Sequence, residues 1–279
     1  MQDFNSKVAV ITGAASGIGR ALALALARQG AQLALCDLDE AGLEETRKLT
    51  SGGAPKVSTH RVDVSDRAAV EQWAHAVIDD HGRVNLLFNN AGVGLSSAIV
   101  DMSYEDLEWL MGINFWGVVH GTTSFLPHLI DSGDGHVINL SSVFGLIAVP
   151  GQAAYNAAKF AVRGYTECLR EELEIMNVGV SATCVHPGGI KTNIARSARV
   201  EGETLGAVKR EAANQRFDQL ARTTPEEAAE QILRAVRRDA RRVLVGPDAH
   251  VIDVLQRAMP TLYQKIVVSR HQEEQGKLS

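Results

Sequence analysis

The chain has 279 residues, of which 45% are hydrophobic, and a net charge of −5 from 28 Lys and Arg against 33 Asp and Glu. This composition is sufficient for the core of one large domain, and the negative charge argues against binding to nucleic acid phosphates. Three cysteines without a CxxC pair, and nine histidines without an HExxH pattern, argue against a disulfide framework and against a metal site. Because no signal peptide pattern and no transmembrane segment of about 18 apolar residues is present, we expect a soluble, cytoplasmic protein.

Short apolar runs rich in β-branched residues alternate with helical patterns along the chain. We expect strands at 8–12, 32–37, 57–64, 84–89, 136–140, 181–186 and 242–246. Helices are expected at 20–29, 67–80, 104–130 with a break near Gly112, and 153–176. The first three strands are mostly apolar rather than alternating, which is typical of strands covered on both faces. The order predicts an α/β fold with a doubly wound parallel sheet, Rossmann-like, of about seven strands in a single domain over residues 1–279.

A glycine-rich turn, TGAASGIG, follows the first predicted strand directly and leads into a helix. Glycines allow a tight turn and close backbone approach, and a helix N-terminus offers unpaired N–H groups to a pyrophosphate. The spacing is G-x-x-x-G-x-G rather than G-x-G-x-x-G, and such a turn can also exist without a ligand. Its position between strand and helix nevertheless predicts a dinucleotide site formed by Gly13, Ser16, Gly17, Ile18 and Gly19.

Asp37 ends the second predicted strand, near the ~20-residue spacing at which an acid binds the adenosine ribose hydroxyls. A 2′-phosphate would be repelled by this carboxylate, and neither Ser16 nor Leu38 supplies a cation to offset the repulsion. The sequence therefore favours NAD over NADP. The alternative is that Asp37 only caps a loop.

Tyr155 and Lys159 are four residues apart on a predicted helix, which places the phenol and the ammonium on one face. Ser142 follows the strand predicted at 136–140, at the strand end where parallel sheets bind ligands. A phenol with its ordinary pKa near ~10 is a poor base at neutral pH, and we expect the neighbouring ammonium to lower that pKa. These three residues are the candidate catalytic group, although Tyr155 alone could be a core aromatic residue.

Two segments near the C-terminus have no assigned chemistry. The stretch 195–224 shows no strand pattern, and we expect a mobile excursion on the substrate side before a helix that begins near Pro225. In the C-terminal extension, 250–279, apolar residues from Val251 to Val267 recur near helical spacing, with Pro260 expected to interrupt the helix. We expect this stripe to pack against a partner subunit or over the substrate pocket, since a membrane-surface helix would carry more Lys and Arg.

Several motifs together resemble the short-chain dehydrogenase/reductase family over roughly residues 5–194: TGAASGIG, Asn89-Asn90-Ala91-Gly92, Ser142, Tyr155-x-x-x-Lys159 and Pro187-Gly188. The resemblance implies that Tyr155 is the general acid/base and that Ser142 holds the substrate oxygen. It implies that Lys159 binds the nicotinamide ribose and lowers the tyrosine pKa, and that Asn114 supports a proton-relay water. Asn114 could instead be a buried helix amide.

The resemblance also implies further cofactor contacts, and family members are commonly dimers or tetramers. Adenine contacts would come from Asp63 and Val64. The adenosine ribose would be lined by Asn90, Ala91 and Gly92. The carboxamide would be oriented by Pro187, Ile190 and Thr192, although Thr192 could be an ordinary helix cap.

These observations predict an NAD-dependent oxidoreductase that moves hydride between nicotinamide and a secondary alcohol or ketone. Apolar residues after Ser142 and at 190–195 favour a hydrophobic substrate, though they could equally be core. One alternative is an NADPH-dependent carbonyl reductase with the same fold. Another is a non-catalytic nucleotide sensor, for which we would expect Tyr, Lys or Ser to be missing. We expect a homodimer or homotetramer.

Overall fold

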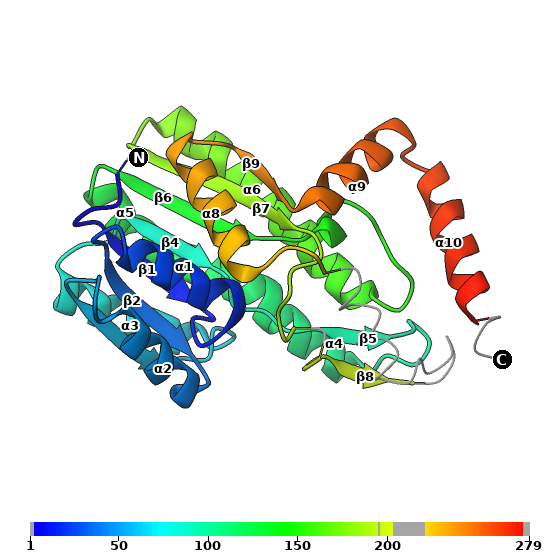
Figure 1. Ribbon diagram of the computed structural model, residues 1–279, viewed down its shortest axis with the longest axis horizontal. Helices are drawn as coiled ribbons and strands as arrows, with labels where there is room; N and C mark the ends of the chain where they lie inside the picture. Colours follow the sequence, from blue (N-terminus) through cyan, green and yellow to red (C-terminus); the bar gives the residue numbers. More distant parts are fainter. Residues whose placement is uncertain (1–2, 195, 203–220, 276–279) are drawn as a thin grey trace.

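The computed structural model describes residues 3–194, 196–202 and 221–275. Within them, seven parallel strands form one sheet in the order β3-β2-β1-β4-β6-β7-β9 (Figure 1). The strands are β1 Val8–Thr12, β2 Gln32–Asp37, β3 Val57–Arg61, β4 Leu86–Asn89, β6 Gly135–Leu140, β7 Val180–Pro187 and β9 Arg242–Val245. The predicted doubly wound parallel sheet is confirmed.

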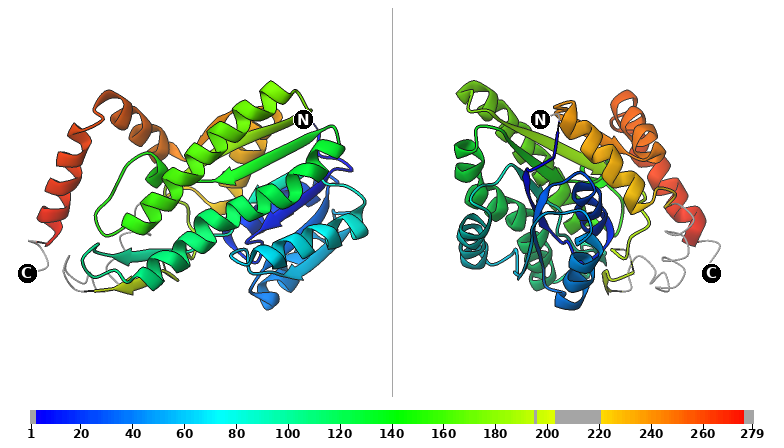
Figure 2. Two further views of the ribbon diagram at one scale, coloured as in Figure 1. Left: turned by 180° about the vertical axis from the view of Figure 1, so that it is seen from behind. Right: turned by 60° about the vertical axis from the view of Figure 1, so that its left-hand side comes forward.

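Helices cover both faces of this sheet, as the two views in Figure 2 show. Helices α1, α2 and α8 pack on one face, and α3, α5 and α6 pack on the other. Their bounds are α1 Gly17–Ala27, α2 Glu40–Thr50, α3 Arg67–His81, α5 Gly117–Asp131, α6 Ala153–Met176 and α8 Pro225–Arg237. The strands are therefore enclosed between two helical layers.

Strand β1 shows why the central strands are buried on both faces. Ala9 and Ile11 belong to the core shared with α1 and α8, whereas Val10 belongs to the core shared with α3, α5 and α6. All three side chains are fully buried. Burying a side chain such as Val or Ile stabilises the fold by roughly 1.5–3 kcal/mol, so the strands form a firm base for the loops at their carboxyl ends.

The break predicted near Gly112 is wrong. Helix α4, Tyr104–Met111, continues through a π-helical segment, Gly112–Trp116, directly into α5. A Cβ on Gly112 would make only an ordinary contact, 3.5 Å from Cβ of Ser65. The closely packed glycine is Gly117 at the start of α5, where a Cβ would lie 2.8 Å from Cγ2 of Val64. The π-helical segment carries Asn114, which is fully buried.

A second, two-stranded parallel sheet was not predicted. It pairs β5, Leu95–Ser97, with β8, Arg199–Glu201, so the described start of the 195–224 excursion contains a strand. All three β8 residues are exposed, which explains the lack of an apolar pattern. The Arg199 guanidinium instead stacks 3.5 Å from the centroid of the Trp109 ring and forms a 3.1 Å ion pair with Asp106. Positions 195 and 203–220 of the predicted excursion lie outside the described residues.

The C-terminal extension forms two helices, α9 Pro247–Ala258 and α10 Leu262–Gln275, with Pro260 between them as predicted. Helix α10 stands apart from the two helical layers, at the right-hand end of Figure 1. Tyr263 is 5% exposed, and its hydroxyl accepts the Ala148 N–H at 3.2 Å, whereas Leu262 and Ile266 are exposed. The apolar stripe is thus only partly covered within one chain. Among the described helices, none has the length and apolar character needed to cross a membrane.

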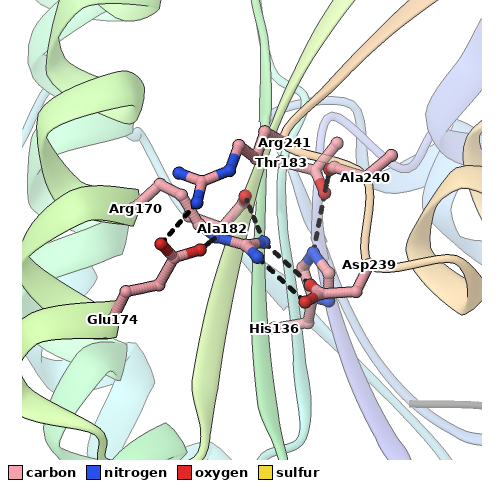
Figure 3. A network of polar contacts seen from close by, with 8 residues as sticks. All are labelled: His136, Arg170, Glu174, Ala182, Thr183, Asp239, Ala240 and Arg241. Carbon is pink, nitrogen blue, oxygen red and sulfur yellow. Dashed lines mark hydrogen bonds and ion pairs between the residues drawn. The ribbon is translucent and has the colours of Figure 1, made fainter.

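A polar network joins α6 to the turn between α8 and β9 (Figure 3). Arg170 of α6 forms two hydrogen bonds with Asp239, at 2.8 and 2.9 Å, and an ion pair with Glu174. Beside it, Nε2 of His136 lies 2.7 Å from Oγ1 of Thr183, which joins β6 to β7. His136 stands at the amino end of β6, so the network secures the sheet at the end opposite to Ser142.

Candidate functional site

The residues predicted to bind a cofactor or to catalyse a reaction gather beyond the carboxyl ends of the strands. The glycine turn follows β1, Asn90 follows β4, Ser142 follows β6, and Ile190 follows β7. Strand order reverses at β1, which has β2 on one side and β4 on the other. Ligands of open α/β sheets bind in the crevice at such a reversal.

The glycine turn is held by Thr12 and Asn90. Oγ1 of Thr12 accepts the N–H groups of Asn90 and Ala91, each at 2.9 Å. Nδ2 of Asn90 donates to the carbonyl oxygens of Thr12 and Gly13, at 2.8 and 3.1 Å. Gly13 has a φ of +65°, and a Cβ there would lie 2.8 Å from Cα of Ala91. A side chain at Gly13 would therefore open the turn.

The turn ends at the N-terminus of α1. Ser16 is the exposed N-cap residue, and its side chain makes no capping hydrogen bond. The helix end, with its partial positive charge, is consequently not neutralised by its own cap. Gly17, the first helical residue, has a φ of +54°. This arrangement suits an anionic group such as a pyrophosphate.

The Asp37 carboxylate lies beside the same turn. Its Oδ2 accepts the Ala15 N–H at 3.0 Å, and its Oδ1 accepts the Asp39 N–H at 3.1 Å. Asp37 therefore does cap loop N–H groups, as the alternative interpretation of this residue proposed. These bonds also fix the carboxylate at the end of β2. The nearby guanidinium of Arg20 is held by an ion pair to Glu45 at 2.8 Å.

Ser142, Tyr155 and Lys159 come together. Ser142 caps a short 3₁₀ turn, Val143–Gly145, and its Oγ accepts the Phe144 N–H at 3.1 Å. Tyr155 and Lys159 lie one turn apart on α6. Nζ of Lys159 is 5.5 Å from the centroid of the Tyr155 ring and donates to the Leu140 carbonyl oxygen at 2.9 Å.

Burial sets the proton affinities of this pair. It raises the pKa of Tyr155 to about 12, while a hydrogen bond with Ser142 acts in the opposite direction. It also lowers the pKa of Lys159 to about 8. The sequence suggests a Tyr155 pKa below its ordinary value because of Lys159. In the structure the loss of hydration outweighs that charge, and Ser142 is the group that lowers the tyrosine pKa.

Asn114 lies next to this group but is already engaged. Its Oδ1 accepts the Val93 N–H at 2.8 Å, and its Nδ2 donates to the Val93 carbonyl oxygen at 2.9 Å. A Cβ on Gly92 would lie 3.3 Å from Oδ1 of Asn114 and 3.7 Å from Nζ of Lys159. Asn114 therefore fixes the segment after β4 against Lys159, and its role toward a relay water stays a prediction.

The remaining predicted cofactor residues border the same crevice. Thr192 lies over the glycine turn, since a Cβ on Gly17 would be 3.2 Å from its Cγ2. Ile190, in the same loop after β7, is buried in the core. After β3, Asp63 accepts the N–H and hydroxyl of Ser65 at 2.9 and 2.7 Å. Val64 is buried nearby and packs against Gly117. Asn90 and Ala91 border the glycine turn through their bonds to Thr12.

The sequence analysis missed the residues that hold the loop after Ser142. Asn156 donates from Nδ2 to the carbonyl oxygens of Phe144 and Ile147, each at 2.8 Å. The Phe144 ring lies edge-on to Tyr155, with centroids 6.1 Å apart. From the C-terminal side, Tyr263 accepts the Ala148 N–H. Adjacency to Tyr155 was the only sequence signal for Asn156, and Tyr263 offered none.

Comparisons with known proteins agree with this arrangement. A family model described as short chain dehydrogenase matches residues 7–202. The putative oxidoreductase SadH of Mycobacterium tuberculosis is 49% identical, with 96% of each chain covered. Dehydrogenase/reductase SDR family member 7B of Xenopus tropicalis is 34% identical over 96% of this chain and 86% of its own.

Two solved structures are similar over most of the chain. One is a short chain dehydrogenase/reductase from Burkholderia phymatum in complex with NAD, with a TM-score of 0.85, 34% identity, and coverage of 94% of this chain and 97% of that one. The other is levodione reductase, with a TM-score of 0.78, 30% identity, and coverage of 89% and 98%.

Proposed function

The chain belongs to the short-chain dehydrogenase/reductase family and is an oxidoreductase, and we propose that it uses NAD to interconvert a hydrophobic secondary alcohol and its ketone. The observation that carries the proposal is the group formed by Ser142, Tyr155 and Lys159 at the strand ends. It stands in the same crevice as a glycine turn with an uncapped helix N-terminus.

The cradle at β1 and β2 fits a dinucleotide. The N-terminus of α1, after Gly13, would hold the pyrophosphate, and Asp37 would hold the adenosine ribose. Adenine would lie by Asp63 and Val64. When bound, the nicotinamide ring supplies the acceptor or donor of hydride. The described relative from Burkholderia phymatum binds NAD, which supports this assignment.

Asp37 favours NAD over NADP in this proposal. Its carboxylate is fixed by the Ala15 and Asp39 N–H groups and would meet a 2′-phosphate with like charge. Arg20, the cation on α1 next to the turn, is paired with Glu45 and also donates to the Ala15 carbonyl oxygen. It is therefore not placed to offset the repulsion. An NADPH-dependent carbonyl reductase is the competing proposal, and cofactor preference separates the two.

The proton is moved by Tyr155 at the substrate oxygen. In the oxidation direction the phenolate takes the proton of the substrate hydroxyl, and in the reduction direction the phenol donates its proton to the carbonyl oxygen. The Ser142 hydroxyl donates a hydrogen bond to the same substrate oxygen and holds it in line. Lys159 uses one of its three N–H groups on Leu140, which leaves two for the nicotinamide ribose. Asn114 positions the segment beside Lys159, where a relay water would connect to solvent.

Only some of the apolar residues predicted after Ser142 and at 190–195 support a hydrophobic substrate. Val143, Leu146 and Ile147 are buried core residues, as the alternative interpretation held. Phe144 and Val149 are partly exposed near Tyr155. We assign the substrate wall to these two side chains together with Ile194.

We also propose a homodimer or homotetramer in the cytoplasm. Trp116, which is 51% exposed, and Phe160, which is 41% exposed, lie on the neighbouring π-helical segment and α6. Side chains of this size gain stability when a second subunit covers them. Cys36, Cys168 and Cys184 are all free thiols, which suits a reducing compartment.

NADH formation by the purified protein tests the proposal directly. Secondary alcohols of graded size would be offered with NAD and, in parallel, with NADP, and the ketones with the reduced cofactors. We expect turnover with NAD that improves as the apolar part of the alcohol grows. Turnover with NADP alone would establish the competing reductase, and no turnover across the panel would contradict the proposed activity.

A further inference from the structure

A side chain links β6 and β7 beyond the point where their backbones stop pairing. The register of the two strands ends at Leu140 and Val185, and the Ser141 N–H donates to the Val185 carbonyl oxygen at 2.8 Å. The next contact across the pair comes from a ring, because Nδ1 of His186 lies 2.9 Å from the carbonyl oxygen of Ser142. Beyond this point the chain at Ser142 leaves the sheet, whereas His186 and Pro187 continue β7 and pair with β9.

The chemistry of this contact fixes the state of the ring. A carbonyl oxygen only accepts, so Nδ1 of His186 carries the hydrogen and donates it. His186 is 0% exposed, and burial lowers its pKa to about 4, so the ring is neutral at working pH and Nε2 is bare. Within the described residues, buried Nε2 has no hydrogen-bond partner.

Stability alone does not account for a histidine at this position. A buried nitrogen without a partner destabilises the folded state, and an apolar side chain of similar size would avoid that cost. The Ser142 carbonyl oxygen also accepts the Gly145 N–H at 2.9 Å, so it would stay paired without His186. What His186 adds is the connection between the serine turn and β7.

We propose that His186 is a positioning residue for the reaction: its ring holds the Ser142 peptide against the carboxyl end of β7, so that the Ser142 hydroxyl stays aligned with Tyr155. The inference rests on the proposed function. Two facts support the geometry. The Ser142 hydroxyl is hydrogen-bonded both to the Phe144 N–H and to Tyr155, so a shift of the Ser142 peptide moves it relative to the phenol. Pro187, the residue after His186, ends β7, and the loop that passes over the glycine turn follows it.

Two substitutions at position 186 separate positioning from packing. His186→Leu keeps an apolar filling but removes the donor, and we expect kcat to fall by about 10- to 100-fold, the effect of misplacing a catalytic group by about 1 Å. KM for NAD and the melting temperature should stay at the wild-type value, or the melting temperature should rise. His186→Asn places an amide N–H where Nδ1–H stands, and it should recover most of the lost kcat.

His136→Leu is the matched control. This second buried histidine makes its own hydrogen bond, to Thr183 (Figure 3). It lies on β6 rather than β7, at the end of the sheet opposite to Ser142. Its loss should lower the melting temperature and leave kcat unchanged. A wild-type kcat in His186→Leu, or equal losses of kcat in His186→Leu and His186→Asn, would overturn the positioning role.

The design also separates this inference from the proposed function. If the wild-type protein oxidises no alcohol, the proposed function fails, and the ring itself is then examined by ¹⁵N NMR. The inference expects the His186 ring to carry its proton on Nδ1 and to resist a second proton down to about pH 5. A ring protonated on Nε2 alone would refute the bond to Ser142 whatever the activity.

Discussion

Tyr155 and Lys159 show how burial acts on two neighbouring groups of opposite charge type. Removing water disfavours the charged form of each, so the tyrosine pKa rises to about 12 and the lysine pKa falls to about 8. The Ser142 hydrogen bond favours the phenolate and opposes part of this shift. The spacing of Tyr155 and Lys159 suggests a phenolate stabilised by an ammonium. Burial instead favours the neutral form of each side chain.

The direction of the pH dependence follows from that resting state. Because the phenolate accepts and the phenol donates, oxidation should accelerate as pH rises from about 6 to about 10, whereas reduction should slow only as the pH approaches the tyrosine pKa. With a tyrosine pKa of about 12, oxidation should still be rising at the end of this range. Initial rates in both directions measure it, and Ser142→Ala should move the profile to higher pH. An oxidation plateau well below pH 9 would show that charge outweighs burial.

Asp37 gives a second prediction at this scale. Asp37→Ala should weaken NAD binding by roughly 10- to 100-fold, the equivalent of about 1.5–3 kcal/mol for a hydrogen bond to a charged group. The same substitution should strengthen NADP binding, because the repelling carboxylate is removed. Fluorescence titration with each cofactor measures the ratio of the NADP dissociation constant to the NAD dissociation constant. Asp39→Ala is the control, because that carboxylate caps α2 through the Gly42 N–H and not the glycine turn. An unchanged ratio in Asp37→Ala would remove Asp37 from cofactor selection.

Among the elements, α10 contacts the loop after Ser142 through Tyr263. Tyr263→Phe removes the acceptor of the Ala148 N–H while keeping the buried ring. We expect KM for the alcohol to rise about fivefold, the equivalent of a lost hydrogen bond of ~1 kcal/mol, with NAD affinity unchanged. Steady-state kinetics with each substrate varied in turn would show this. Tyr104→Phe, at an exposed ring on α4, should have the wild-type KM for the alcohol. An equal KM in the Tyr263→Phe and Tyr104→Phe variants would show that α10 has no part in substrate binding.

Elements with their own apolar pattern were predictable from the sequence, and elements held by particular contacts were not. Strand β1 is apolar from Val8 to Ile11 because both of its faces are covered, and the glycine turn follows from Gly13 and its positive φ. Strand β8 is exposed and depends on Arg199 stacking over Trp109, a contact between distant parts of the chain. Gly112 was misinterpreted because a glycine inside a continuous helical segment looks the same in sequence as one that ends a helix.

For the whole molecule, the two buried histidines at opposite ends of β6 and β7 couple stability to pH. Burial lowers the pKa of His136 and of His186 to about 4, whereas an unfolded histidine titrates near ~6.5. Between these values the unfolded chain binds more protons, so the unfolding free energy should fall as pH drops from about 6.5 to about 4, by up to ~3 kcal/mol per histidine.

Urea unfolding at about pH 7 and about pH 5 measures this loss. A protein with both histidines replaced by leucine should lose less stability over the same interval, since neither site then takes up a proton on unfolding. An identical loss in that variant and in the wild type would place the acid sensitivity elsewhere in the chain.

The central claim, that Tyr155 moves the proton in an NAD-dependent alcohol–ketone reaction, is tested most directly by Tyr155→Phe. The substitution keeps the ring and removes the transferable proton, so kcat should fall by about 10²–10⁴-fold while the dissociation constant of NADH stays at the wild-type value. Tyr165→Phe, on the same helix α6, should keep its kcat. If Tyr155→Phe turns over alcohol at the wild-type rate, the assigned mechanism is wrong.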